Sequence, residues 1–291
     1  MTTPATTQIG APRGLTSTGL KTIALVLMVL DLIHYFFGFT GWIPDWFSML
    51  GRLSAPLFLF CVVEGFTHTR NRKKYFLKVY ALSVLMSALL MLMSIFGLLV
   101  RPDGFYPMNG MMTSFAILMI VWQGIDWLGE KRYLRGLAAV ILPLAWPFLL
   151  SMAQGMLPAL RLPLSVLGLT LVPTWGFSLD ACIPVLIEGI LLYMLRRNRR
   201  RQALAFIIFD FLFFFVLVYV SFLTSQPADF HWTQMFTTYY EWYGAFAGLL
   251  MLCYNGRRGS GHKALFNPFY PAHIYILYAL SWAAYPLLAG G

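Results

Sequence analysis

Long apolar segments alternate with short polar or basic segments along almost the whole chain. Each apolar segment holds about 20 mostly apolar residues, the length that an α-helix needs to cross the hydrocarbon core of a bilayer. The pattern predicts an all-α polytopic membrane protein, a bundle of about nine transmembrane helices with eight to ten as the range. The predicted spans lie near residues 20–41, 46–67, 75–99, 108–127, 133–152, 177–195, 203–224, 239–254 and 265–288.

The first 18 residues are polar and rich in Thr, which predicts a short disordered cytoplasmic tail over 1–18. Residues 19–291 are expected to form a single transmembrane helical domain. The apolar segment after Lys21 is too long for the apolar region of a signal peptide, and no small-residue cleavage site follows it. We therefore expect this segment to remain as the first span.

Basic residues gather in four clusters between the predicted spans. They read HTRNRKK (68–74), EKRYLR (130–135), RRNRRR (196–201) and NGRRGSGHK (255–263). Membrane proteins keep such clusters on the cytoplasmic side. With the N-terminus inside, all four clusters share that side only if 153–176 crosses the membrane an even number of times or not at all. This stretch, interrupted by three prolines and Arg161, is thus predicted to be a re-entrant or surface segment, and the C-terminus is predicted to lie outside.

Composition agrees with a membrane protein, because 59% of the residues are hydrophobic and only 11% are charged, against roughly 25% charged in a soluble domain. The net charge of +10 would suit nucleic acid, but clustering at the ends of spans favours a topology signal. Cys61, Cys182 and Cys253 lie far apart in apolar segments, so neither a disulfide framework nor a zinc site is implied. One GxxxG pair, Gly244 and Gly248, more often marks close helix packing than a ligand site.

The first predicted span carries two ionisable residues. Asp31 lies ten residues after Lys21, so roughly 15 Å into the membrane, and His34 lies one turn further toward the outside. At i,i+3 the two share a helix face, where a carboxylate can fix the tautomer of an imidazole and raise its basicity, as a general base requires. The alternative is a polar pair that holds helices together. Two ionisable groups at one buried level are costly, which favours the functional interpretation.

Two more acids are expected inside the membrane. Glu188 lies eight residues before Arg196, and Asp210 lies nine residues after Arg201. Both are then roughly 12–14 Å from the cytoplasmic face. Arg52, inside the outer end of the second span, could neutralise one acid. Structural ion pairing and a role in a site stay equally open for Glu188 and Asp210.

Further polar groups lie nearer the cytoplasmic side. His273 is expected one or two turns inside the inner leaflet, and Glu64 and His68 share a helix face at i,i+4. Polar groups therefore occur at several depths. A polar channel through the bundle explains this better than unrelated exceptions.

The cytoplasmic stretches HTRNRKK and YNGRRG mix Asn, His or Gly with Arg, which suits hydrogen bonds to phosphate and close backbone approach. Simple topology signalling is the alternative for both. Neither GxSxG, a Walker loop, HExxH nor a DxD-like motif occurs, which argues against a hydrolase or a nucleotide-driven enzyme, and nothing indicates a metal. The candidate phosphate-binding residues are Arg70, Asn71, Arg72, Lys73, Asn255, Arg257 and Arg258.

Four blocks of sequence resemble a known family. They are GLKTIALVLMVLD (19–31), GRLSAPLFLFCVVEGFTHTRNRKKY (51–75), YNGRRG (254–259) and FYPAHIYIL (269–277). In this order they resemble the TraX family of bacterial inner-membrane proteins, which is known for N-terminal acetylation of conjugative pilin and is similar to a wider group of membrane acyltransferases. Residues of about 100–240 resemble the family only in hydropathy.

The resemblance implies functional residues at matching positions. The acid of the first span falls on Asp31, and the histidine after Tyr-Pro falls on His273. Members often show Asp-His in the first span, but Leu32 follows Asp31 here, and His34 is the candidate replacement one turn on. The general base therefore stays open between His34 and His273. The remaining matched positions are Arg52, Glu64, His68, Arg70, Asn71, Asn255 and Arg257.

The resemblance also implies a cytoplasmic acetyl-CoA donor, with an amine or hydroxyl acceptor such as a pilin N-terminus, a glycan or a lipid-linked sugar. CoA carries several phosphate charges, which basic side chains at a helix end can bind. Two other functions stay open. One is a proton-coupled transporter or channel that uses the buried acids, although no internal repeat is visible. The other is a non-catalytic pilus-assembly scaffold that holds a pilin-like helix.

Overall fold

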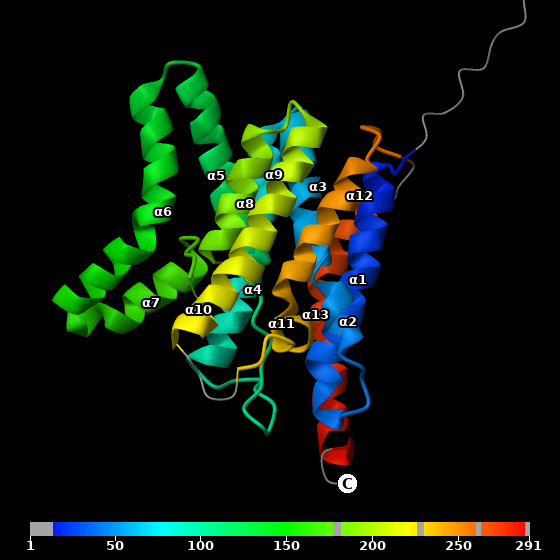
Figure 1. Ribbon diagram of the computed structural model, residues 1–291. Helices are drawn as coiled ribbons and strands as arrows, with labels where there is room; N and C mark the ends of the chain where they lie inside the picture. The colour runs from blue at the N-terminus through cyan, green and yellow to red at the C-terminus, as the bar shows by residue number, and fades with distance from the viewer. Residues whose placement is uncertain (1–13, 177–181, 226–229, 260–262, 289–291) are drawn as a thin grey trace, which may run out of the picture.

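Apolar helices make up most of the computed structural model, which describes residues 14–176, 182–225, 230–259 and 263–288 (Figure 1). The described residues contain no strand, so the all-α class is confirmed. The first five helices are α1 (Ser17–Phe37), α2 (Trp46–Gly51), α3 (Ser54–His68), α4 (Arg72–Ser94) and α5 (Met111–Gly129). The next are α6 (Tyr133–Met156), α7 (Arg161–Thr170), α8 (Ile183–Met194), α9 (Arg199–Phe211) and α10 (Val218–Ser225). The last are α11 (Gln234–Thr237), α12 (Ala247–Leu252) and α13 (Lys263–Leu288).

Short irregular helices join several of these elements. A six-residue π-helix, η4 (Leu212–Leu217), continues α9 into α10 without a break. Within the described residues, the 3₁₀-helices are η1 (Gly38–Thr40), η2 (Pro158–Leu160) and η5 (Tyr240–Phe246), and η5 runs directly into α12.

Six described segments are long and apolar enough to cross a membrane, so the predicted count of nine is not confirmed. They are Ser17–Thr40, Trp46–His68, Arg72–Ser94, Met111–Gly129, Tyr133–Met156 and Arg199–Ser225. The span predicted at 177–195 contains the 12-residue helix α8, and its residues 177–181 lie outside the described chain. The span predicted at 239–254 consists of η5 and the six-residue α12 instead of one long α-helix.

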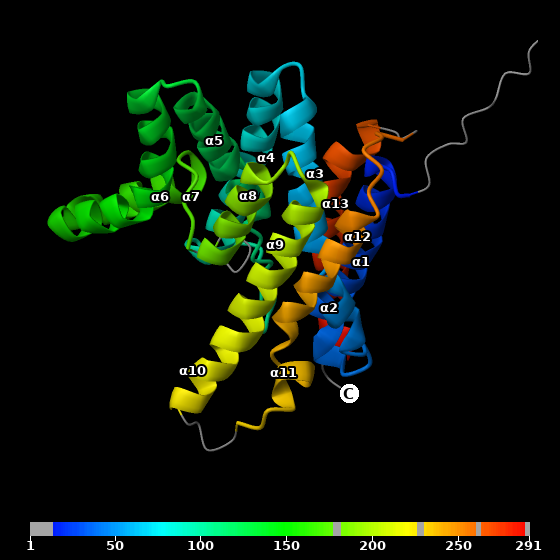
Figure 2. The ribbon, with the colours of Figure 1, turned by 45° about the horizontal axis from the view of Figure 1, so that its top comes forward.

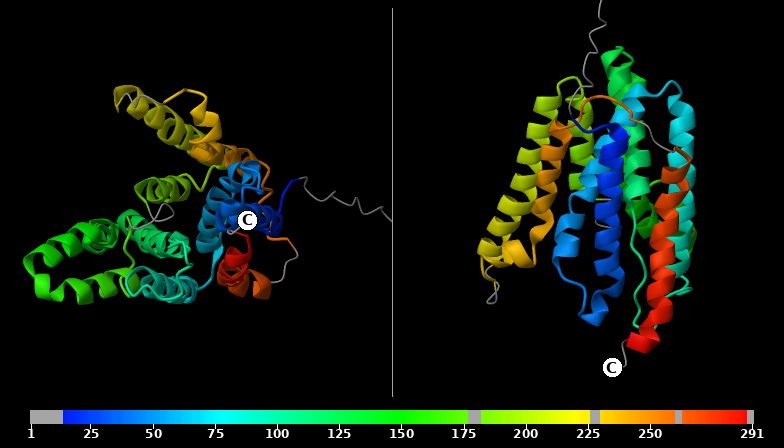
Figure 3. Two further views of the ribbon diagram at one scale, coloured as in Figure 1. Left: turned by 90° about the horizontal axis from the view of Figure 1, so that it is seen from below. Right: turned by 90° about the vertical axis from the view of Figure 1, so that its right-hand side faces the viewer.

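The described basic clusters lie at one end of the bundle. Figures 1 and 2 place the start of α1, the α3–α4, α5–α6 and α8–α9 turns, and the end of α12 at this end. We call it the basic end. In Figure 3 the long helix α13 runs alongside α1 and finishes at the opposite end of the bundle.

Helices α6 and α7 form an arm that stands away from the rest of the bundle (Figure 1). Two prolines, Pro143 and Pro147, lie inside α6. Helix α7 has 10 residues and is therefore about 15 Å long, too short to cross a bilayer. The stretch 153–176 thus makes no full helical crossing, in agreement with the prediction from charge.

Close helix packing depends on glycines. A Cβ atom on Gly248 would lie 2.3 Å from Cγ1 of Ile207 and 3.2 Å from the carbonyl oxygen of Ala203, both on α9. A Cβ atom on Gly244 would lie 3.0 Å from Oδ1 of Asp210. The GxxxG pair therefore packs η5 and α12 against α9, and the prediction of a packing role is confirmed.

Candidate functional site

Asp31 on α1 faces the α2–α3 junction. Its Oδ1 accepts a 2.8 Å hydrogen bond from the Ser48 hydroxyl and lies 3.6 Å from Nη2 of Arg52. Arg52 also donates to the Ser48 oxygen at 2.8 Å, so the three side chains form one network. A Cβ atom on Gly51 would lie 2.3 Å from the Asp31 side chain. The glycine therefore lets α2 approach the carboxylate closely.

The expected pairing of Asp31 with His34 is wrong. Nε2 of His34 lies 3.2 Å from Oδ1 of Asp45, an exposed residue just before α2. Asp31 instead faces Ser48 and Arg52, because α2 packs against α1 and brings these two residues to the carboxylate. The carboxylate that orients His34 is thus Asp45, which the sequence analysis did not single out.

Glu188 on α8 and Asp210 on α9 form a buried pair, with residue exposures of 4% and 2%. The two carboxyl groups lie close enough to interact electrostatically, and Oδ2 of Asp210 has no hydrogen-bond partner among the described residues. Two carboxyl groups can hydrogen-bond only when one of them carries a proton. Because two carboxylates buried side by side repel one another, we expect this pair between α8 and α9 to hold one proton.

The acid pair and the Asp31 network meet at η5. A Cβ atom on Gly244 would lie 3.0 Å from Oδ1 of Asp210 and 3.5 Å from the backbone oxygen of Arg52. The guanidinium of Arg52 also lies over the Tyr240 ring, 5.6 Å from its centroid. Residues of η5 thus contact both the acid pair and the Asp31 network. Arg52 does not pair directly with Glu188 or Asp210 among the described contacts; its ion pair is with Asp31.

His273 on α13 is 6% exposed, and only one of its two ring nitrogens has a hydrogen-bond partner among the described residues. Nδ1 lies 2.6 Å from the carbonyl oxygen of Phe269, and the imidazole stacks on the Phe269 ring at 4.8 Å. A carbonyl only accepts, so Nδ1 carries the proton and Nε2 carries a lone pair. Nε2 is buried and has no hydrogen-bond partner among the described residues. His273 and His34 contact different residues, so the described contacts do not join them.

Glu64 lies at the basic end, where α3 meets α9. Arg199 binds it in a bidentate way, with Nη1 3.1 Å from Oε1 and Nη2 3.1 Å from Oε2. The guanidinium of Arg199 packs against the rings of Phe60 and Tyr254, with 4.7 Å to each ring centroid. His68 is mostly exposed, and its Nδ1 lies 4.0 Å from Oε2 of Glu64. Glu64 and His68 thus share a face as predicted, but the main partner of Glu64 is Arg199.

Arg72 points into the bundle. It donates to Oδ2 of Asp126 at 2.7 Å, and Arg196 donates to Oδ1 of the same carboxylate at 2.9 Å. The Tyr193 hydroxyl donates to Asp126 at 2.8 Å. Asp126 therefore ties α4, α5 and α8 together. The guanidinium groups of Arg72 and Arg196 are therefore both paired with the Asp126 carboxylate and join these helices.

The other basic candidates differ in position. Asn71 caps α4, since its side chain accepts from the backbone N–H of Lys74 at 2.9 Å. Arg70 and Lys73 are exposed. The two arginines of the YNGRRG loop are exposed as well, while their backbone carbonyls accept from the first N–H groups of α1.

Asn255 fixes this loop to the chain before α1. Its backbone N–H donates to Leu15 at 2.9 Å, and its side chain donates to the carbonyl of Gly14 at 3.1 Å. Its side-chain oxygen accepts from the N–H of Arg257 at 2.9 Å. Asn255 is therefore a positioning residue for the loop, and it leaves the Arg257 and Arg258 side chains free to project from the basic end.

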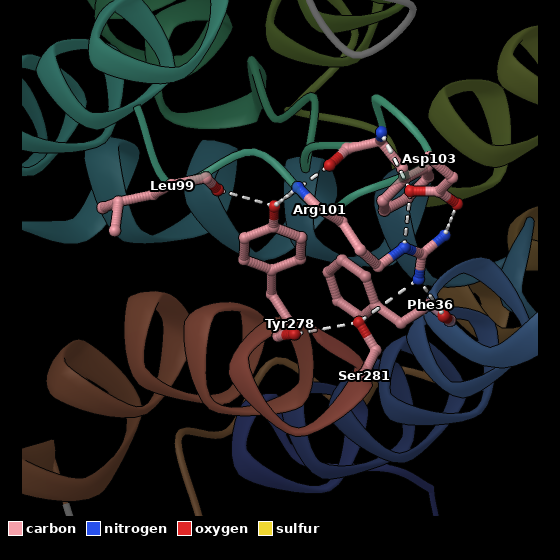
Figure 4. Close-up of polar contacts among 7 residues, drawn as sticks. Phe36, Leu99, Arg101, Asp103, Tyr278 and Ser281 are labelled. Atoms are coloured by element: carbon pink, nitrogen blue, oxygen red, sulfur yellow. Dashed lines mark hydrogen bonds and ion pairs between the residues drawn. The ribbon is translucent and has the colours of Figure 1, made fainter. Parts of the chain in front are cut away.

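Arg101 is a buried arginine at the end of the bundle opposite the basic end, and the sequence pattern did not indicate it. Figure 4 shows its guanidinium between Asp103, Phe36 and Ser281, with Tyr278 beside it. It donates to both carboxylate oxygens of Asp103 at 2.9 and 2.7 Å and to the carbonyl of Phe36 at 2.9 Å. The ion pair holds the pKa of Asp103 below its usual range. The cluster fastens the loop after α4 to α1 and α13.

No group of three or more His, Cys, Asp or Glu side chains in the described residues could hold a metal ion. The apolar helices define a multi-pass helical membrane protein, and several separate clusters of polar side chains lie within it.

Comparison with known proteins identifies the family. A family model described as TraX protein matches residues 17–281, so the chain belongs to the TraX family. The probable fimbrial assembly protein FimC, serogroup H1, of Dichelobacter nodosus is 44% identical over 57 residues. That alignment covers 19% of this chain and 23% of FimC, so the chain matches about a quarter of that relative's length. No solved structure matches.

Proposed function

We propose that the protein is an acyltransferase of the bacterial inner membrane, which moves an acetyl group from cytoplasmic acetyl-CoA to an amine or hydroxyl acceptor. The N-terminus of a pilin subunit is the leading candidate acceptor. The observation that carries the proposal is the state of His273, a buried imidazole with Nδ1 held by a carbonyl and Nε2 unpartnered. The resemblance of the motif blocks to an acetylating family supports the same reaction.

His273 has the form of a general base. A lone pair on Nε2 can accept the proton of the acceptor amine or hydroxyl as that group attacks the acetyl carbonyl. The new N–C or O–C bond forms, the thioester C–S bond breaks, and the proton passes from the imidazolium to the CoA thiolate that leaves. The carbonyl of Phe269 fixes the tautomer throughout. His34 suits this role less well, because its Nε2 is already paired with Asp45.

The basic end supplies a mouth for the donor. His68 is exposed beside the Glu64–Arg199 pair, and the loop after Tyr254 presents the exposed Arg257 and Arg258. Arginine binds phosphate oxygens with two parallel hydrogen bonds, which suits the phosphates of CoA. The Glu64–Arg199 pair positions this mouth by joining α3 to α9.

The same proposal sets the orientation. The basic end faces the cytoplasm, as the positive-inside rule requires, with nine crossings and a C-terminus in the periplasm. A pilin acceptor would then reach the interior from the membrane or the periplasmic side. The name of the FimC relative, a probable fimbrial assembly protein, supports an acceptor from a pilus-like structure.

Thermal unfolding of the purified protein with ligands tests donor binding. Acetyl-CoA and free CoA are expected to raise the unfolding temperature, whereas ATP and other unrelated nucleotides are not. Arg257→Gln with Arg258→Gln is expected to weaken the shift, and Arg135→Gln with Lys131→Gln is the matched control at the same end. An unshifted unfolding temperature at millimolar acetyl-CoA would count against the proposal.

A proton-coupled transporter is the second candidate function. The observation in its favour is the burial of Glu188 and Asp210 beside one another, because buried acids of this kind mark proton paths in membrane proteins. This alternative predicts solute-dependent proton flux in proteoliposomes and no stabilisation by CoA. Proton flux without CoA binding would replace the acyltransferase proposal.

A further inference from the structure

The outer face of α4 carries three lysines beside an apolar strip. A shallow hollow of about 510 Å³ is lined by Asn71, Lys73, Lys74, Leu77, Lys78 and Ala81. Asn71 caps α4, and the other five residues lie in the first half of this helix, next to the basic end. The hollow is therefore a feature of one helix surface and is separate from the buried polar clusters of the bundle.

The positive charge of this hollow is not neutralised. No ion pair joins Lys73, Lys74 or Lys78 to a carboxylate in the part of the chain that the structure describes. A second hollow of about 460 Å³, lined by Arg199, Arg200, Leu204 and Leu252, differs in this respect, because Arg199 pairs with Glu64. Three uncompensated ammonium groups within two helical turns attract an anion.

The hollow becomes apolar along the helix axis. Leu77 and Leu85 are more than half exposed, and Ala81 between them is exposed too. These positions follow one another at i,i+4 and continue the line from Lys73. The same surface thus offers a basic end at the level of lipid headgroups and an apolar strip that extends toward the membrane interior.

The opposite face of α4 is closed. Arg72 binds Asp126, and Tyr75 reaches Gly65, where a Cβ atom would lie 2.9 Å from its hydroxyl. The side of α4 that faces the bundle is therefore occupied by contacts to α5 and α3. That geometry suits a molecule that stays at the periphery and does not suit a donor that must deliver its thioester to the interior.

We propose that this face of α4 binds an anionic phospholipid, with Lys73, Lys74 and Lys78 on the headgroup phosphate and one acyl chain along Leu77, Ala81 and Leu85. The proposal goes beyond the acyltransferase function and does not depend on it. Lysine contributes here as a compact charge with three donors and holds phosphate without a fixed geometry. A headgroup with a net negative charge is preferred to a zwitterionic one.

Spin-labelled lipids test this proposal on the full-length protein in phosphatidylcholine nanodiscs. The fraction of motionally restricted label is measured for phosphatidylglycerol and for phosphatidylcholine. The unaltered protein is expected to prefer phosphatidylglycerol, and K73Q/K74Q/K78Q is expected to lose most of that preference, since each lysine near an anionic lipid is worth roughly a fivefold change in affinity. K131Q/R132Q/R135Q removes three charges at the same end and is expected to keep the preference.

Three results would overturn the proposal. One is an unchanged phosphatidylglycerol preference in K73Q/K74Q/K78Q. Another is an equal loss in both triple variants, which would mean a general surface-charge effect. The third is a lysine variant that keeps the lipid preference but loses its thermal shift with CoA, which would make the hollow a nucleotide site. If the lysine variant fails to fold, the single substitution Lys78→Gln with the same readout replaces it, since Lys78 lies within α4 and makes no described ion pair.

Discussion

Arg199 and Glu64 form a two-bond ion pair between α9 and α3, with both N–O distances at 3.1 Å and Glu64 almost fully buried. The guanidinium also packs against the rings of Phe60 and Tyr254, which contact one another edge to face. Removing one charge of such a pair leaves the other unpaired in a weakly polar environment. The pair therefore links the stability of the basic end to the geometry of the proposed donor mouth.

Breaking this pair is expected to destabilise the protein. Glu64→Leu should lower the free energy of unfolding by about 3 kcal/mol, because Arg199 is left partly buried and uncompensated. The double variant Glu64→Leu with Arg199→Leu should recover part of that loss, since it removes both charges. Unfolding in mild detergent measures both. A double variant that is no more stable than Glu64→Leu alone would contradict this view of the pair.

A proton shared by Glu188 and Asp210 would have a spectroscopic consequence. Infrared spectra at neutral pH should contain the carbonyl band of a protonated carboxylic acid that exchanges slowly in deuterated water. Glu188→Gln should remove that band and still fold, since the amide can donate to Asp210 in place of the shared proton. Glu241→Gln, a substitution in η5, is the control and should keep the band. The absence of a protonated-acid band in the unaltered protein would show that no proton is shared.

The Arg101–Asp103 cluster predicts a dependence of stability on pH at the opposite end. The pKa of Asp103 is lowered in the folded state, chiefly by its hydrogen bonds to Arg101. Its contribution is therefore fully present above the unfolded value of roughly 3.9 and is lost as pH falls through the lower folded value.

Unfolding temperatures of the unaltered protein and of Asp103→Asn, compared between pH 7 and pH 3, measure this contribution. The difference between the two proteins should be constant near neutral pH and should shrink at the acidic end. A difference that grows below pH 4 would contradict the assignment.

Glycine packing gives a steric prediction. Gly248→Ala would place its methyl group 2.3 Å from the Ile207 side chain, so overpacking should cost about 1–3 kcal/mol. Ile207→Ala in the same chain should restore part of the loss by making room. Gly129→Ala is the matched control, because nothing lies within 4 Å of its new methyl group. Equal destabilisation by both alanines would show that steric contact at Gly248 is unimportant.

The hydropathy pattern predicted the helical class and the positions of most long helices, because the bilayer imposes a length on apolar segments. It did not predict that 239–254 would form η5 and α12, since that break depends on the close contacts of Gly244 and Gly248 with α9. The basic clusters predicted which turns lie at the same end. Positive charge at turns is a local signal that needs no knowledge of packing.

The sequence showed which ionisable residues lie in the apolar helices, but not which partners they contact. Helical spacing placed Asp31 and His34 on one face, yet the packing of α2 against α1 gave them separate partners, Arg52 with Ser48 and Asp45. Arg199 belonged to a cluster that resembled a plain topology signal, and only the fold brings it to Glu64. Partners that lie more than a hundred residues apart leave no trace in local spacing.

Transfer of labelled acetyl from acetyl-CoA to membrane or pilin acceptors tests the central proposal most directly. His273→Ala should reduce the transfer rate by at least a hundredfold, the usual contribution of a general base, while acetyl-CoA still raises the unfolding temperature. His231→Ala, an exposed histidine before α11, should transfer acetyl at the unaltered rate. Full activity in a folded His273→Ala protein, or no transfer from the unaltered protein to any amine or hydroxyl acceptor, would contradict the account.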